Sequence, residues 1–234
     1  MANSWSALSR EIVACRQCPR LVEYRERIAR EKRRAYRDWN YWGKPVPGFG
    51  DANARIVLIG LAPGAHGSNR TGRMFTGDAS GEFLYSALHR AGFANQSTAL
   101  KIGDGLQLRE VFITAICRCA PPDNKPTPQE QSNCLPYLER ELEMLKHARV
   151  VVALGRIAFD GYLRLLRAQG HVIPRVAFKH GAVYNLAKVA DPSQGSLPML
   201  ICAYHPSKQN TQTGRLTRAM FDAVIRQAGK HADA

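Results

Sequence analysis

The chain has 234 residues, 45% of them hydrophobic, so it can bury the core of one sizeable domain and is not a disordered chain. Its 33 Lys and Arg residues outnumber its 19 Asp and Glu residues and give a formal net charge of +14, which is typical of proteins that bind polyanions such as nucleic acids. No apolar run is long enough to span a bilayer and the first residues do not resemble a secretory signal, which predicts a cytoplasmic protein.

The first part of the chain is predicted to be helical and strongly basic. The pattern favours helix over residues 6–38, broken near Cys15 to Cys18, and Pro19 suits the first turn of a second helix. Residues 25–37 hold the densest basic stretch of the chain. At helical spacing these cations cover more than one face, so they either lie along phosphates or form a solvated surface.

A glycine-rich loop follows the first predicted strand. Residues 55–59 are mostly apolar and β-branched without alternation, which predicts a buried parallel strand. The run Gly-Leu-Ala-Pro-Gly-Ala-His-Gly begins directly after it at Gly60. Open α/β sheets bind ligands in such loops at the carboxyl ends of strands. In this loop the glycines let a ligand approach the backbone closely, Phe75 can stack on a ring, and Asp78 lies at the end of the loop. These residues are suited to binding a flat polar ring. It matches neither a phosphate-binding P-loop nor a dinucleotide-binding loop.

The remainder of the chain alternates predicted helices and strands. We expect helices over about 80–91, 127–146, 156–168 and 217–229, strands over 111–116, 149–154 and 198–204, and a weaker strand or hairpin within 171–187. Thr127, Pro128 and Glu130 suit the first positions of their helix as N-cap, N1 and N3. The alternation predicts an α/β protein with a mostly parallel central sheet covered on both faces, a three-layer α/β/α architecture.

Three predicted strand-end loops each carry a polar side chain suited to chemistry. They are residues 60–78 with Asp78, residues 117–128 with Asn124, and residues 205–215 with His205. Because parallel strands end at one edge of a sheet, these loops can converge on one site. Structural alternatives remain at this point: Phe75 as a core aromatic, Asp78 as a helix cap, and His205 as a histidine hydrogen-bonded to backbone.

The six cysteines are predicted to be reduced rather than paired in disulfides, because the chain is expected to be cytoplasmic. Cys15 and Cys18 form a Cys-x-x-Cys pair, and Cys117, Cys119 and Cys134 offer a second pair far along the chain. Two segments that each give two thiolates describe a four-thiolate metal or iron–sulfur site. The long gap argues against a compact zinc finger, and spacing alone does not choose between Cys117 and Cys119.

Several of these segments together are similar to the motifs of one known family. They are Gly60–Gly67, Gly72–Asp78, Arg118–Asn124 and Tyr204–Thr211. In this order they resemble family 5 uracil-DNA glycosylases, bacterial and archaeal base-excision enzymes that carry a four-iron, four-sulfur cluster. The resemblance covers nearly the whole chain. It implies the α/β/α uracil-glycosylase fold as a single domain, residues 1–234, whose N-terminal helical segment, about 6–40, is tied in by the cluster.

The resemblance also implies roles for individual residues. The implied ligands of the [4Fe-4S] cluster are Cys15, Cys18, Cys119 and Cys134. The implied substrate pocket contains Gly64, Ala65, His66 and Phe75, the last stacking on the extruded base. The implied catalytic residues are Asp78, Asn124 and His205. Family 4 enzymes have a glutamate where this chain has Ala65, so activation of water must fall to Asp78, to ordered water or to electrostatics.

The resemblance implies a monofunctional DNA repair glycosylase that flips uracil out of DNA and hydrolyses its N-glycosidic bond. It also implies activity on hypoxanthine, xanthine or ethenocytosine. We expect a monomeric, nucleoid-associated protein whose partner is damaged DNA, with no membrane contact. Lys208 and Arg215, with Arg218, either grip phosphates or form an ordinary basic surface. The alternatives are a non-enzymatic iron–sulfur nucleic-acid-binding protein of the same fold and a zinc-stabilised nucleotide hydrolase.

Overall fold

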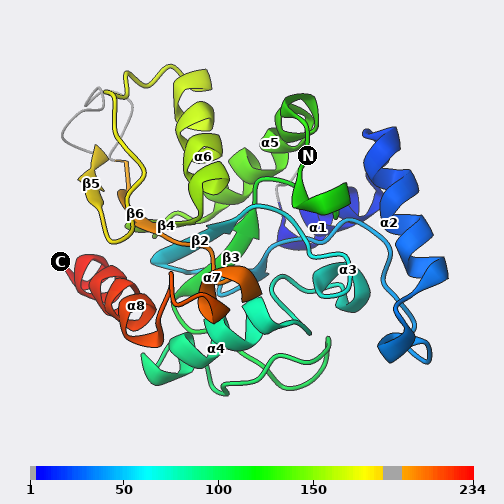
Figure 1. Ribbon diagram of the computed structural model, residues 1–234. Helices are drawn as coiled ribbons and strands as arrows, with labels where there is room; N and C mark the ends of the chain where they lie inside the picture. Colours follow the sequence, from blue (N-terminus) through cyan, green and yellow to red (C-terminus); the bar gives the residue numbers. More distant parts are fainter. Residues whose placement is uncertain (1–3, 187–196) are drawn as a thin grey trace.

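A computed structural model describes residues 4–186 and 197–234 as a sheet with helices on both faces (Figure 1). The strand order is β1-β3-β2-β4-β6-β5. The strands are β1 Phe49–Gly50, β2 Ile56–Gly60, β3 Val111–Ala115, β4 Val150–Leu154, β5 Val183–Asn185 and β6 Met199–Ala203. The strands β3, β2, β4 and β6 are parallel, and the edge strands β1 and β5 pair antiparallel. This confirms the predicted α/β class with a mostly parallel sheet.

The helices fall into layers. They are α1 Trp5–Ala14, α2 Pro19–Glu31, α3 Ser68–Thr71, α4 Ala79–Arg90, α5 Pro128–Met144, α6 Arg156–Ala168, α7 Lys208–Gln212 and α8 Arg218–Asp233, with short 3-10 turns η1 Arg34–Tyr36 and η2 Pro122–Asn124. Figure 1 shows α5 and α6 on one side of the sheet and α4 and α8 on the other. None of the helices in the described ranges is long and apolar enough to cross a membrane.

Alternate residues of each central strand enter two different apolar cores. On β2, Ile56 and Leu58 pack with Leu84 of α4 and Phe221 of α8. Their neighbours Val57 and Ile59 face the opposite way and pack with side chains of α5 and α6. Successive side chains of a strand point to opposite faces, so an unbroken apolar run is what a sheet covered on both sides requires. The predicted three-layer arrangement follows from this pattern.

The long helix α5 begins as its sequence predicts. The Thr127 hydroxyl accepts a hydrogen bond from the backbone N–H of Glu130, and the Glu130 carboxylate accepts one from the backbone N–H of Thr127. This capping box satisfies two N–H groups that the first turn would otherwise leave unpaired.

Two segments differ from the sequence-based expectation. The helix expected to reach residue 38 ends at Glu31, because Lys32 adopts a φ of 54°, and the chain then turns through η1. The loop expected over 205–215 contains the short helix α7, capped by Ser207. The weak strand predicted within 171–187 corresponds to β5, and the part of that range beyond Leu186 lies outside the described residues.

Candidate active site

A pocket lies at the carboxyl edge of the sheet, between the loop after β2 and the loop after β6. These two strands flank β4 and run parallel to it, so their ends lie at the same edge. The pocket is lined by Ala62, Gly64, Ser68, Met74, Phe75, Asp78, Ser80 and His205. The structure thus brings together two of the three strand-end loops singled out in the sequence, with both of their key polar residues.

Phe75 sits at the boundary between pocket and core. Its ring centroid lies 5.7 Å from that of His205, with the ring planes inclined by 30°. Gly60 leaves room for the ring, since a Cβ there would lie 2.9 Å from a Phe75 ring carbon. The Phe75 backbone has a φ of 51°, a left-handed conformation that is costly outside glycine and tends to occur at functional sites. The ring is therefore both a core aromatic and a wall of the pocket.

Asp78 serves as the N-cap of α4. Its Oδ1 accepts a hydrogen bond of 3.0 Å from the backbone N–H of Gly81. Its other oxygen, Oδ2, faces two glycines of the motif loop: a Cβ at Gly67 would lie 1.9 Å from it, and a Cβ at Gly64 would lie 3.0 Å away. Burial raises the pKa of Asp78, although the hydrogen bonds from Gly81 and Ser80 oppose that rise. Capping and pocket lining are thus compatible roles.

His205 is held in a neutral state by its surroundings. Burial lowers the pKa of its imidazole to about 4, so the ring is uncharged near neutral pH. Its backbone carbonyl accepts a hydrogen bond of 2.9 Å from Nδ2 of Asn210. Gly155, at the end of β4, allows the His205 backbone to approach, because a Cβ there would lie 3.3 Å from the His205 Cβ. A neutral imidazole at the pocket can donate a hydrogen bond without carrying charge.

Arg70 holds the motif loop against the segment after α2, a contact that no sequence pattern predicted. The Arg70 guanidinium lies 3.9 Å from the centroid of the Tyr36 ring and 4.0 Å from that of Trp39. It also donates hydrogen bonds to the carbonyls of His66, at 2.8 Å, and Gly77, at 2.6 Å. These partners lie in separate parts of the chain and share no local pattern that could have revealed them.

His66 is bound on a second side by the segment after η1. Its Nδ1 lies 2.9 Å from the hydroxyl of Tyr41. Burial lowers the pKa of His66, and the nearby guanidinium groups of Arg33 and Arg70 lower it further. His66 does not belong to the pocket lining itself, so in this structure it anchors the motif loop rather than facing the pocket.

The remaining predicted site residues lie apart from the pocket. Asn124 is exposed at the end of η2, with a φ of 56°, and is not part of the lining. Ala65 lies between two lining segments. Lys208 and Arg215 are exposed on the chain that follows His205, and the Arg215 guanidinium lies 4.8 Å from the centroid of the Tyr204 ring.

Four cysteines line a separate cavity between α2, the end of β3 and α5. They are Cys15, Cys18, Cys119 and Cys134. Cys117 instead packs in the apolar core on the α5 and α6 side of the sheet. In the described part of the chain, no three or more His, Cys, Asp or Glu side chains are already drawn together around a single ion position. The cysteine pairs distant in sequence nevertheless meet at one cavity.

Nitrogen donors surround the sulfur atoms of this cavity. Arg25 Nη1 donates to Cys119 Sγ at 3.0 Å, and the backbone N–H of Arg118 donates to Cys134 Sγ at 3.2 Å. Asn133 Nδ2 lies 3.5 Å from Cys18 Sγ. The Arg25 side chain is only 2% exposed, and its Nε has no hydrogen-bond partner among the described residues. These donors act against burial, which raises the pKa of both Cys18 and Cys119.

A mostly parallel sheet with a pocket at its carboxyl edge is the arrangement in which open α/β proteins bind ligands. The sequence model of the uracil DNA glycosylase superfamily matches residues 47–229, and the chain belongs to this superfamily. It is 52% identical over 228 residues to the Type-5 uracil-DNA glycosylase of Thermus thermophilus, covering 97% of both chains. It is 49% identical over 232 residues to that of Mycobacterium tuberculosis, covering 99% of this chain and 83% of the relative. It is 45% identical over 221 residues to that of Pyrobaculum aerophilum, covering 94% of this chain and 90% of the relative.

Proposed function

We propose that the protein is a monofunctional uracil-DNA glycosylase that takes the extruded base into the pocket between Phe75 and Asp78. The observation that carries this proposal is the meeting of Phe75, Asp78 and His205 at one pocket, in a chain that belongs to the superfamily. An aromatic ring, a carboxylate and a neutral imidazole are the groups that this hydrolysis needs. The relatives with the printed name Type-5 uracil-DNA glycosylase support the choice of uracil.

Base extrusion is the first physical requirement. A base within a duplex hides its glycosidic bond, and extruding it costs a few kcal/mol. Stacking on an aromatic ring such as Phe75 contributes about 1–3 kcal/mol in return. The fixed backbone of Phe75 and the glycine beneath its ring mean that this surface is formed before the base arrives.

Asp78 and His205 then act on opposite ends of the breaking bond. Cleavage develops positive charge on the sugar and negative charge on the leaving base. The Asp78 carboxylate stabilises the sugar and orients a water toward it, which is consistent with its being the acidic member of the pocket lining. His205, neutral near pH 7, donates a hydrogen bond to a base oxygen. The methyl side chain of Ala65 has no group that could take over either task.

We further propose that Cys15, Cys18, Cys119 and Cys134 hold a [4Fe-4S] cluster. The donor set fits this group: four sulfur atoms at one cavity, N–H donors aimed at three of them, and the orphaned Nε of Arg25 beside them. The cluster would supply a rigid cross-link from α1 and α2 to the loop after β3 and to α5. It would thereby tie the N-terminal helices into the single domain that we propose for residues 1–234.

The exposed polar residues around the pocket belong to the DNA contact in this proposal. Lys208 and Arg215 follow His205 and would pair with phosphates on either side of the extruded nucleotide. Asn124, exposed on η2, would meet the DNA rather than the base inside the pocket.

Base release from a duplex oligonucleotide with one uracil opposite guanine tests the proposal. We expect strand scission only after alkali, because a monofunctional glycosylase leaves an intact abasic strand. Asp78→Asn should remove most of this activity while keeping the helix cap, since asparagine caps as well as aspartate. Unchanged base release in Asp78→Asn, or scission without alkali, would contradict the assigned mechanism. DNA binding without any release would indicate a binding protein of the same fold.

A further inference from the structure

Phe75 has a backbone conformation that its neighbours must enforce. Its φ of 51° belongs to the left-handed region, which is unfavourable for a bulky side chain and persists only where the surrounding structure over-determines it. The direction of the ring follows from this backbone, because the Cα–Cβ bond turns with it. Whatever fixes Met74 and Thr76, on either side of Phe75, therefore also fixes the ring in the pocket.

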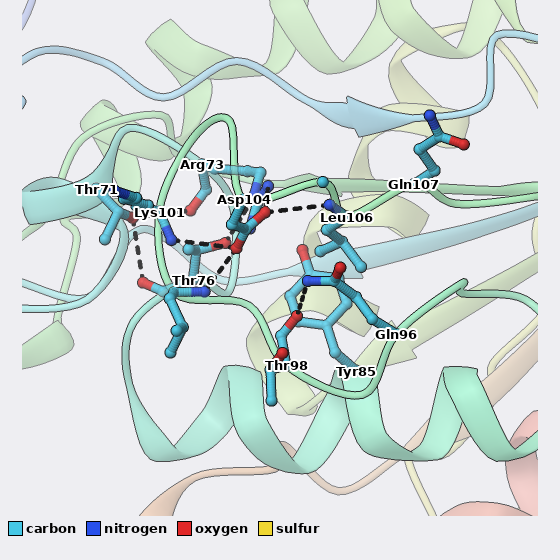
Figure 2. A network of polar contacts seen from close by, with 12 residues as sticks. Thr71, Arg73, Thr76, Tyr85, Gln96, Thr98, Lys101, Asp104, Leu106 and Gln107 are labelled. Carbon is cyan, nitrogen blue, oxygen red and sulfur yellow. Dashed lines mark hydrogen bonds and ion pairs between the residues drawn. The ribbon is translucent and has the colours of Figure 1, made fainter.

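Buried hydrogen bonds hold both of these neighbours, within the network of polar contacts in Figure 2. The carbonyl of Met74 accepts a hydrogen bond of 2.8 Å from the hydroxyl of Tyr85 and one of 3.1 Å from Oγ1 of Thr76. The carbonyl of Thr76 accepts one of 3.1 Å from Oγ1 of Thr71. The fully buried hydroxyl of Thr76 thus links the residue after Phe75 to the carbonyl before it.

The Thr76 hydroxyl is itself oriented by a buried ion pair. It accepts a hydrogen bond of 2.9 Å from Nε of Arg73, which leaves its proton for the Met74 carbonyl. The two terminal nitrogens of the same guanidinium donate to the Asp104 carboxylate at 2.8 and 2.7 Å, and the two side chains are 6% and 8% exposed. A guanidinium is planar, so its two bonds to Asp104 also fix the direction of Nε toward Thr76.

Asp104 is anchored in turn by the loop between α4 and β3. Its carboxylate accepts the backbone N–H groups of Leu100, Lys101 and Leu106. Burial alone would raise the pKa of Asp104, but the Arg73 guanidinium and these N–H groups hold it well below its ordinary value. The ion pair therefore stays charged at neutral pH, and an unbroken series of hydrogen bonds connects this loop to the backbone around the stacking ring.

We propose that Thr76, oriented by the Arg73–Asp104 ion pair, is a positioning residue that holds the Phe75 ring where it stacks on the extruded base. The inference rests on the proposed function and adds to it three residues that do not line the pocket. Their effect passes through Phe75. With the hydroxyl in place the stacking surface is formed before the base arrives, so no ordering of the ring opposes stacking.

The test compares Thr76→Val with Thr76→Ser. Valine keeps the volume of threonine but has no hydroxyl, so the Met74 carbonyl and Nε of Arg73 each lose a partner while the ion pair remains. Serine keeps the hydroxyl and loses only a methyl group. Thermal unfolding measures the stability that each variant loses. If Thr76→Val does not fold, Asp104→Asn replaces it in both measurements, because it removes the charge of the ion pair and keeps the shape of the side chain.

Thr114→Val is the matched control. Thr114 is fully buried, like Thr76, and its hydroxyl lies 2.6 Å from Nη1 of Arg118 and 2.5 Å from Oε2 of Glu141, which form a second buried ion pair. Glu141 belongs to α5, whereas Phe75 packs with side chains of α4 and α8 on the opposite face of the sheet. The control therefore removes the same kind of hydroxyl from the same kind of environment without touching the stacking ring.

The first measurement needs no DNA. The centroid of the Phe75 ring lies 5.7 Å from that of the His205 ring, close enough for the ring current of Phe75 to shift the NMR signals of the His205 ring protons. Phe75→Leu gives the positions of these signals without that ring. We expect Thr76→Val to move the signals toward those positions, while Thr76→Ser and Thr114→Val leave them unchanged.

The second measurement is uracil release from duplex oligonucleotides. We expect Thr76→Val to lose about tenfold in kcat/KM, equivalent to about 1.4 kcal/mol, which lies within the range for stacking of a base on an aromatic ring. Thr76→Ser and Thr114→Val should remain close to the wild type. In a Phe75→Leu background, Thr76→Val should cause no further loss, because its effect passes through the ring that is already absent.

Unchanged His205 signals in Thr76→Val would overturn the positioning role. An equal loss of kcat/KM in Thr76→Val and Thr114→Val, or an undiminished further loss in the Phe75→Leu background, would also overturn it. Failure of the wild type to release uracil would instead overturn the proposed function, and the NMR comparison would still decide whether Thr76 holds the ring.

Discussion

The guanidinium of Arg70 lies 3.9 Å from the centroid of the Tyr36 ring, which places a cation of the motif loop against the segment after α2. Trp39 covers it at 4.0 Å, so the guanidinium stacks on two aromatic rings. Its hydrogen bonds to the carbonyls of His66 and Gly77 hold the loop on both sides of the short helix α3. The residues that shape the pocket therefore depend on packing outside it.

Replacing Arg70 with lysine should impair catalysis although the charge is kept. Lysine cannot make two directed hydrogen bonds while stacking in a plane, and a desolvated cation–π contact is worth about 2 kcal/mol. We expect kcat/KM for uracil release to fall by about tenfold and the melting temperature to fall by several degrees. Arg27→Lys is the matched control, because Arg27 lies 5.5 Å from the Tyr24 ring on an exposed helix face. Equal behaviour of the two variants would contradict this role of Arg70.

Because of Asp78, activity should rise with pH while the contribution of this residue to stability falls. Burial raises its pKa in the folded protein, so the unfolded chain loses this proton at lower pH than the folded chain does. The contribution of Asp78 to stability therefore falls as pH rises from its ordinary pKa through the raised one. Over the same range kcat/KM should rise, because the carboxylate is the active form.

The measurement is a pair of pH series, of kcat/KM and of the free energy of unfolding, for the wild type and Asp78→Asn. The variant should have low activity with little pH dependence, and its stability relative to the wild type should increase with pH. Subtracting the free energy of unfolding of the variant from that of the wild type removes the contribution of His205. That contribution changes with pH in the opposite direction. His205 has a folded pKa of about 4, so its contribution to stability rises with pH from there to its ordinary value. A wild-type profile identical to that of Asp78→Asn would refute the role of Asp78.

A methyl group at Gly67 should displace the Asp78 carboxylate. A Cβ there would lie 1.9 Å from Oδ2, far inside contact distance, so the carboxylate must move. Displacements of about 1 Å at a reacting group can cost about 100-fold in rate, and we expect a loss of that order in kcat for Gly67→Ala. Gly181→Ala serves as the control: its φ of 77° is strained for alanine, but a Cβ there meets nothing within 4 Å. Gly181→Ala should lose stability and keep its activity.

The sequence predicted the sheet and most helices because their signals are local. The apolar run at residues 56–60 and the capping residues Thr127 and Glu130 specify structure without reference to distant partners. The stacking of Arg70 on Tyr36 could not be predicted in this way, since it depends on the turn that follows Lys32.

The expectation that loops at the carboxyl ends of parallel strands converge located only part of the candidate site. It correctly placed Phe75 and Asp78 near His205, because β2 and β6 are separated by one strand. Two strands separate β3 from β6, so the loop after β3 starts one strand further from His205. This loop contributes Cys119 to the cysteine cavity, and its Asn124 is exposed to solvent. Which loops converge depends on strand order, and strand order is a long-range property that periodicity does not reveal.

The choice between Cys117 and Cys119 gives the sharpest test of the proposed cluster. Cys119 lines the cysteine cavity and accepts a hydrogen bond from Arg25, whereas Cys117 packs in the apolar core. We expect Cys119→Ala to lose the bound iron, the inorganic sulfide and the brown colour, and to unfold at lower temperature. Cys117→Ala removes a buried sulfur only two residues from Cys119 in the sequence. This variant should lose some stability but keep its full iron and sulfide content. Iron retained in Cys119→Ala and lost in Cys117→Ala would reverse the assignment, and zinc in place of iron in freshly purified wild-type protein would exclude the cluster.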